Sequence, residues 1–97
     1  MEQITIKDMR QAIVYVSNGN RVHKIGDINN LSDEKLAKCD FLHDLRMGNI
    51  RVANVSIELQ RRRNLYFPPE VIRNAKDGTV GAMLESINSY LNEKADN

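Results

Sequence analysis

The chain has 97 residues, of which 41% are hydrophobic, and its formal net charge is +1. A chain of this length predicts a single domain over residues 1–97, ordered from about residue 4 to about residue 92. The hydrophobic content excludes general disorder. The near-zero charge excludes a global electrostatic attraction to nucleic acid or to an anionic membrane.

The sequence also carries few signals for a cellular address or a metal. Its single cysteine, Cys39, excludes an intrachain disulfide and fits a reducing compartment. No apolar run is long enough to span a membrane, and the first residues lack the features of a secretory signal. These observations predict a cytoplasmic protein that does not bind membranes. His23 and His43 lie too far apart, with only one cysteine between them, to form a zinc site, so no metal is predicted.

The segment from Thr5 to Ser17 predicts the first helix. Thr5 is a suitable N-cap, and Asp8 favours the positive end of the helix dipole. The β-branched run at 13–16 also fits a strand, but the period of the apolar residues favours a helix. Asn18-Gly19-Asn20 predicts its end, because these residues tolerate left-handed conformations. The residues expected on its apolar face are Ile6, Met9, Ile13 and Val16.

A long connection then leads to Gly48, and such a length requires structure of its own in a compact domain. The run from Ser32 to Lys38 predicts one short helical turn within it. A second helix is expected over 49–63, with Asn64 as its end. The residues expected on its core-facing side are Ile50, Ala53, Val55, Ser56 and Leu59.

The last third of the chain predicts two more helices. Pro68-Pro69-Glu70 begins a short helix through about Ala75, since proline is tolerated in a first turn. Thr79 is expected to cap the final helix, and the polar tail over 92–97 is expected to fray. The fold class is therefore all-α, a small four-helix bundle of three longer helices and one short one. The residues expected on the apolar side of the final helix are Val80, Met83, Leu84, Ile87 and Leu91.

Several segments, taken in order, resemble the acyl carrier protein family. Phe41-Leu42-His43-Asp44-Leu45 is similar to the Phe-x-x-Asp-Leu that leads to the family's Gly-x-Asp-Ser-Leu motif. Leu65-Tyr66-Phe67-Pro68 and Gly78-Thr79-Val80-Gly81 also resemble family segments at the expected separations. The likeness covers the chain from about Ser32 to about Leu91. It implies the carrier fold, in which a phosphopantetheine arm on the motif serine holds acyl groups.

The attachment motif itself departs from the family. A gapless alignment places Gly48 at the aspartate, Asn49 at the serine and Ile50 at the leucine. A serine hydroxyl can be deprotonated and attack phosphorus, whereas an amide nitrogen shares its lone pair with the carbonyl. We expect Asn49 to cap the second helix but to remain unmodified. The sequence therefore predicts no phosphopantetheine and no other cofactor.

The second helix also departs from the family in its charge. Carrier proteins present an acidic second helix to basic partners, but here arginines dominate and Glu58 is the only acid in the helix. The resemblance therefore implies a protein partner with an acidic docking surface. An arginine run at a helix end is equally explained by solvation and the helix dipole. The residues expected to contact the partner are Arg46, Met47, Arg51, Asn54, Ile57, Arg61 and Arg62.

These features lead to one functional hypothesis and two alternatives. The first is a non-enzymatic acyl-carrier-like protein, in or derived from a pathway of the fatty-acid or polyketide type, that acts as a protein-interaction module. An alternative is a genuine carrier with its arm on another residue, for which Ser56 is the only serine in the second helix. A small nucleic-acid-binding domain is a further alternative, although no stacking aromatic accompanies the arginines. No pair of titratable groups indicates catalysis.

Overall fold

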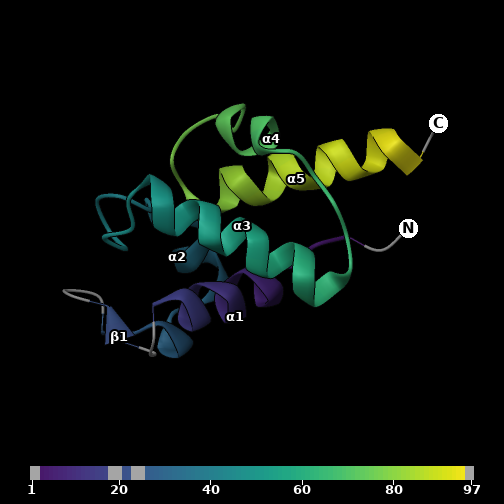
Figure 1. The fold of residues 1–97 in the computed structure, drawn as a ribbon. Helices are drawn as coiled ribbons and strands as arrows, with labels where there is room; N and C mark the ends of the chain where they lie inside the picture. Colours follow the sequence, from purple (N-terminus) through teal and green to yellow (C-terminus); the bar gives the residue numbers. More distant parts are fainter. Residues whose placement is uncertain (1–2, 18–20, 23–25, 96–97) are drawn as a thin grey trace.

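The computed structural model describes residues 3–17, 21–22 and 26–95, and it shows a small all-α bundle (Figure 1). This confirms the fold class predicted from the sequence. The elements in chain order are α1 (Ile6–Val16), β1 (Arg21–Val22), β2 (Gly26–Asp27), the 3-10 turn η1 (Ile28–Asn30), α2 (Asp33–Lys38), α3 (Asn49–Arg63), α4 (Pro69–Arg73) and α5 (Val80–Ala95).

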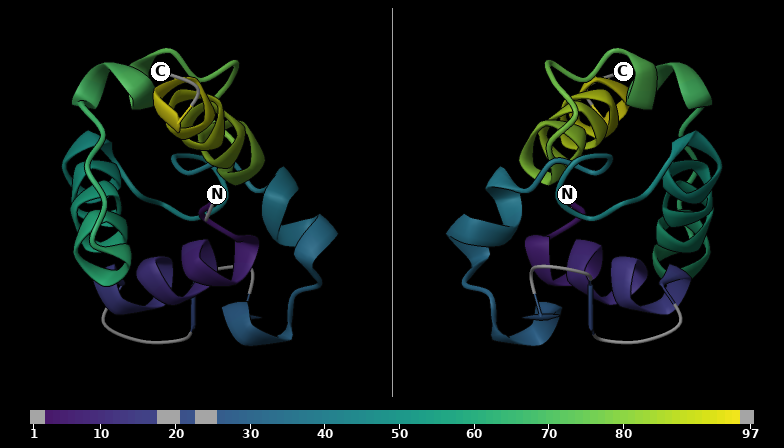
Figure 2. Two further views of the ribbon diagram at one scale, coloured as in Figure 1. Left: turned by 90° about the vertical axis from the view of Figure 1, so that its right-hand side faces the viewer. Right: turned by 90° about the vertical axis from the view of Figure 1, so that its left-hand side faces the viewer.

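Helices α1, α2, α3 and α5 surround the core, as the end-on views show (Figure 2). α3 lies on one side and α2 on the opposite side, with α1 and α5 closing the remaining two sides. α4 packs against α5 and sits beside the C-terminal helix rather than in the ring. The largest fully buried side chains come from every side of this ring and are Ile4, Met9, Ile13, Ile28, Leu36, Met47, Leu59, Phe67, Met83 and Ile87.

The first helix forms where its capping residues predict. The Thr5 hydroxyl accepts the Asp8 amide N–H at 3.2 Å, and Asp8 Oδ2 accepts the Thr5 N–H at 2.9 Å. This reciprocal pair satisfies two donors that a helix start would otherwise leave free. Ser17 closes the helix, while the predicted stop at 18–20 lies outside the described residues.

The long connection carries more structure than the sequence indicated. The predicted turn is α2, whose N-cap Ser32 accepts the Lys35 N–H at 3.2 Å. The two-stranded antiparallel pair β1–β2 and the turn η1 were not predicted. After α2, the carboxylate of Asp40 accepts the backbone N–H groups of Leu42 and His43, which folds the chain into a tight turn.

The later helices keep their predicted order with small changes of length. Asn64 ends α3 in the left-handed conformation, with φ of 51°, as expected for asparagine. α4 ends at Arg73 rather than near Ala75, and the Thr79 hydroxyl caps α5 by accepting the Ala82 N–H at 3.2 Å. α5 continues to Ala95, beyond residue 92 where the polar tail was expected to begin.

Two backbone bonds join the turn before α3 to the start of α5. Phe41 donates to the Gly78 carbonyl and Val80 donates to the Cys39 carbonyl, each at 2.9 Å. A side chain at Gly78 would place its Cβ 2.8 Å from Asp40 Oδ2, so the carboxylate that holds the turn would have to shift. The turn that precedes α3 is therefore attached to the start of α5.

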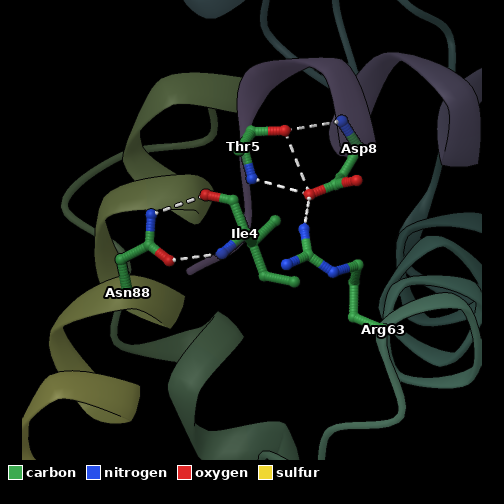
Figure 3. Close-up of polar contacts among 5 residues, drawn as sticks. All are labelled: Ile4, Thr5, Asp8, Arg63 and Asn88. Carbon is green, nitrogen blue, oxygen red and sulfur yellow. Dashed lines mark hydrogen bonds and ion pairs between the residues drawn. The ribbon is translucent and has the colours of Figure 1, made fainter. Parts of the chain in front are cut away.

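Polar contacts hold the N-terminal segment in place (Figure 3). Asn88 of α5 accepts the Ile4 N–H and donates to the Ile4 carbonyl, both at 2.9 Å, as a neighbouring strand would. On the other side, Arg63 at the end of α3 is paired with Asp8 of the α1 capping box. The start of α1 is thus linked to both long helices.

A candidate docking surface on α3

The start of α3 differs from the expected geometry by one residue. Gly48, not Asn49, is the N-cap, and no side chain caps the helix. The expectation that the Asn49 side chain caps α3 is therefore wrong, because Asn49 is already the first helical residue. Gly48 has φ of −77° and open space where a Cβ would stand, so neither strain nor crowding requires a glycine here.

The turn into α3 is held by an unusual backbone conformation. Arg46 is exposed and has φ of 57°, a left-handed conformation that is uncommon outside glycine and asparagine. This reversal brings the Met47 N–H to the Phe41 carbonyl at 2.7 Å. It also turns the Met47 side chain inward, where it is 1% exposed. The expectation that Met47 contributes apolar contact to a partner is therefore wrong.

α3 has apolar residues on two faces, and the sequence did not separate them. The inward face carries Val55, Ser56 and Leu59, as expected. Ile50 and Ala53, which were expected to face the core, are exposed instead, and Ile50 is 81% exposed. Residues three, four and seven apart share one side of a helix. We define the outward stripe of α3 as Ile50, Ala53, Asn54, Ile57 and Arg61.

Glu58 organises the arginines next to this stripe. Its carboxylate accepts Arg61 Nε at 3.1 Å and Arg61 Nη2 at 2.7 Å, and it also accepts Arg62 Nε. Glu58 is only 4% exposed, and its hydrogen bonds from Arg61 and Arg62 hold its pKa below the usual range against the effect of burial. Both guanidinium groups lie over the ring of Tyr15 from α1, with the Cζ atoms of Arg61 and Arg62 at 5.9 and 5.6 Å from the ring centroid. The side chains of Arg61 and Arg62 are therefore held in place by Glu58 and Tyr15.

Arg63 has a different role from its two neighbours. Its side chain is 18% exposed and is paired with Asp8. Burial opposes ionisation of Asp8, but hydrogen bonds from Thr5 and the charge and hydrogen bond of Arg63 lower its pKa. Arg63 thus joins α3 to α1, and the outward-facing charge comes from Arg51, Arg61 and Arg62.

Two hollows flank the first turns of α3. A hollow of 550 Å³ lies between α3 and α4 and is lined by Val52, Ile57, Tyr66 and Ile72 among others. A smaller one of 270 Å³ lies between the turn at Asp40 and the start of α5. Asn49 contributes to both. With Ile57 61% and Tyr66 69% exposed, the rim of the larger hollow is apolar and continuous with the outward stripe.

The residues at the start of α3 do not fit a phosphopantetheine arm. No serine or threonine occurs between Arg46 and Val55, and the Asn49 amide is not a nucleophile. Ser56, the alternative attachment residue, is 7% exposed, and its hydroxyl accepts Gln60 Nε2 at 3.2 Å. At 7% exposure the Ser56 hydroxyl is a poor attachment site, although Ser56 borders the hollow between α3 and α4.

Other residues considered in the sequence form no site within the described part of the chain. Over residues 3–17, 21–22 and 26–95, no group of histidine, cysteine and acidic side chains could hold a metal ion, and His23 lies outside these ranges. Cys39 is half-buried, and burial together with the charge of Asp44 raises the pKa of its thiol. Among the described helices, none is long and apolar enough to cross a membrane.

Comparison with known proteins adds no relative. No family model, curated protein or solved structure matches this chain. The likeness to acyl carriers stays a prediction that depends on the residues quoted above. The features that sequence reasoning missed are the outward position of Ile50 and the burial of Glu58. The spacing of Glu58 three and four residues before Arg61 and Arg62 was a usable signal for its ion pairs with them, but not for its burial.

Proposed function

We propose that this protein is a non-enzymatic interaction module of acyl-carrier-like design that lacks the attachment serine and binds an acidic protein partner. The outward stripe of α3 supplies apolar contact through Ile50 and Ile57, and Arg51 and Arg61 supply positive charge. One observation carries the proposal. The single acidic residue of α3, Glu58, is buried and paired with Arg61 and Arg62, so every exposed charge on this helix is positive.

The composition of the surface supports recognition rather than mere solubility. Ile50 and Ile57 are two of the five large hydrophobic side chains that are most exposed among the described residues. An apolar patch with charged residues at its edge is typical of protein interfaces, where the apolar part contributes affinity and the charge selects the partner. Basic docking surfaces, which carriers meet in their synthases, would be repelled by the same arginines.

Affinity capture tests the docking face directly. Arg51→Glu and Ile57→Ser alter exposed residues of α3, and Lys38→Glu makes the same charge reversal on α2, on the opposite side of the bundle (Figure 2). Captured proteins from the source cells are compared by quantitative mass spectrometry, with circular dichroism as a check of folding. We expect Arg51→Glu and Ile57→Ser to lose partners that Lys38→Glu retains. If all three variants capture the same proteins as the parent, α3 is not the docking face.

The absence of the arm is tested separately. Incubation with a promiscuous phosphopantetheinyl transferase and coenzyme A should leave the intact mass unchanged, because Asn49 has no hydroxyl to attack phosphorus. A carrier protein with an intact motif serves as the positive control for the enzyme. A mass gain equal to one phosphopantetheine would instead identify a genuine carrier and end the proposal.

A further inference from the structure

We infer that Glu58 is a positioning residue that fixes Arg61 and Arg62 as a paired receptor for two carboxylates of an acidic, amphipathic peptide segment. This inference rests on the proposed function and names the chemistry of the partner. The cluster formed by Tyr15, Glu58, Arg61 and Arg62 is called the arginine platform below. It lies where the C-terminal part of α3 packs against α1.

The hydrogen bonds of the platform leave several guanidinium N–H donors unused. A guanidinium carries five N–H groups in a fixed planar fork. Arg61 uses Nε and Nη2 for Glu58, and Arg62 uses Nε for the same carboxylate. The remaining N–H groups of both side chains have no hydrogen-bond partner among the described residues. With one carboxylate shared by two guanidinium groups, the platform keeps a positive charge.

The geometry reduces the cost of binding. Arginine side chains are flexible, and ordering one at an interface opposes association. Here Glu58 accepts hydrogen bonds from both arginines, and the Tyr15 ring centroid lies within 6 Å of each guanidinium carbon. Their conformations are therefore restricted before the partner arrives. Arg62 is 32% exposed and Arg61 is 64% exposed, so both remain accessible.

The surroundings identify the occupant as an acidic amphipathic segment. Ile57 lies one helical turn before Arg61 on the outward stripe, so an apolar side chain of the partner would sit beside the charged contact. A helix with acidic residues next to apolar ones matches this order. A second copy of the chain does not, because two α3 helices would place their arginines against one another.

The probe is a synthetic peptide with leucines at helical spacing and glutamates elsewhere, and its control has lysine in place of each glutamate. Binding is followed by NMR on the isotope-labelled protein, including the Nε–H signals of Arg61 and Arg62. We expect the parent to bind the acidic peptide but not the basic one. Glu58→Gln adds positive charge, so electrostatics alone would strengthen binding. We expect about fivefold to hundredfold weaker binding instead, because two side chains lose their restraint.

Equal or tighter binding by Glu58→Gln would overturn the inference. If that variant does not fold, the double variant Arg61→Lys and Arg62→Lys takes its place, since it retains the charge but loses the planar fork. Unchanged binding by this double variant would also overturn the inference. Loss of binding in Arg51→Glu together with unchanged binding in Glu58→Gln leaves the proposed function standing without the platform. A parent that does not prefer the acidic peptide refutes both.

Discussion

Replacing Gly48 by aspartate should stabilise the protein, because α3 begins without a side-chain cap. An aspartate improves on glycine as an N-cap by a few tenths of a kcal/mol, and its charge at the helix N-terminus adds about 0.3–1 kcal/mol. Losing the flexibility of glycine in the unfolded chain adds about 0.4–1 kcal/mol. Gly48 has a φ of −77° and nothing within 4 Å of its added Cβ, so no opposing strain is expected.

The total of about 1–2 kcal/mol should raise the melting temperature by at least about 4 °C in a domain of this size. Thermal unfolding followed by circular dichroism measures the shift. Gly48→Asn retains the cap without the charge and should give a smaller gain, while Gly48→Ala offers no cap and should lie about 1 kcal/mol below Gly48→Asp. Adding Asn49→Ser should change little, since Asn49 is exposed. If Gly48→Asp is no more stable than Gly48→Ala, α3 does not begin at this residue.

Two further predictions concern the contacts that hold the helices together. Because the pKa of Asp8 is lowered on folding, its contribution to stability is present above the unfolded pKa of 3.8 and is lost as the pH falls through the folded pKa. Urea unfolding should be measured between pH 2 and pH 7, about the range where carboxyl groups titrate. The free energy of unfolding should fall less on acidification in Asp8→Asn than in the parent. Asn88→Ala leaves the Ile4 N–H and carbonyl without their partner and should lower the free energy of unfolding by about 1–3 kcal/mol. Hydrogen exchange at the Ile4 amide should become faster. An unchanged exchange rate would contradict the Asn88–Ile4 hydrogen bonds in Figure 3.

The helices could be predicted because their signals are local. The cap at Thr5, the left-handed Asn64 and the cap at Thr79 each act within a few residues of their own position. Such signals need no knowledge of the neighbouring elements. The two-residue strands β1 and β2 have no such signal, since a strand of that length shows no alternation of apolar and polar residues.

The candidate site was harder to predict because it depends on packing between distant segments. Ile50 and Val55 are both apolar, and the side on which α3 packs against α1 and the rest of the core determines which of them is buried. Met47 turns inward because Arg46 takes a left-handed conformation that the sequence does not predict. The ion pairs of Glu58 follow from its spacing to Arg61 and Arg62, but the position of Tyr15 from α1 against both arginines does not.

The start of α3 breaks several local rules at once, and this distinguishes it from an ordinary solvated helix. Arginines in the last turn suit the helix dipole, so Arg61 and Arg62 alone would need no functional explanation. Arg51 in the first turn opposes the dipole, Gly48 provides no cap, and Ile50 is 81% exposed. Sequences tend to depart from such rules where function requires it. Gly48→Asp should therefore stabilise the fold and yet weaken binding of the acidic peptide, because it places a negative charge beside Arg51. Gly48→Asn should stabilise the fold to a smaller degree and leave binding unchanged. If Gly48→Asp binds the peptide as tightly as Gly48→Asn does, the first turn of α3 lies outside the interface, and only its C-terminal part contacts the partner.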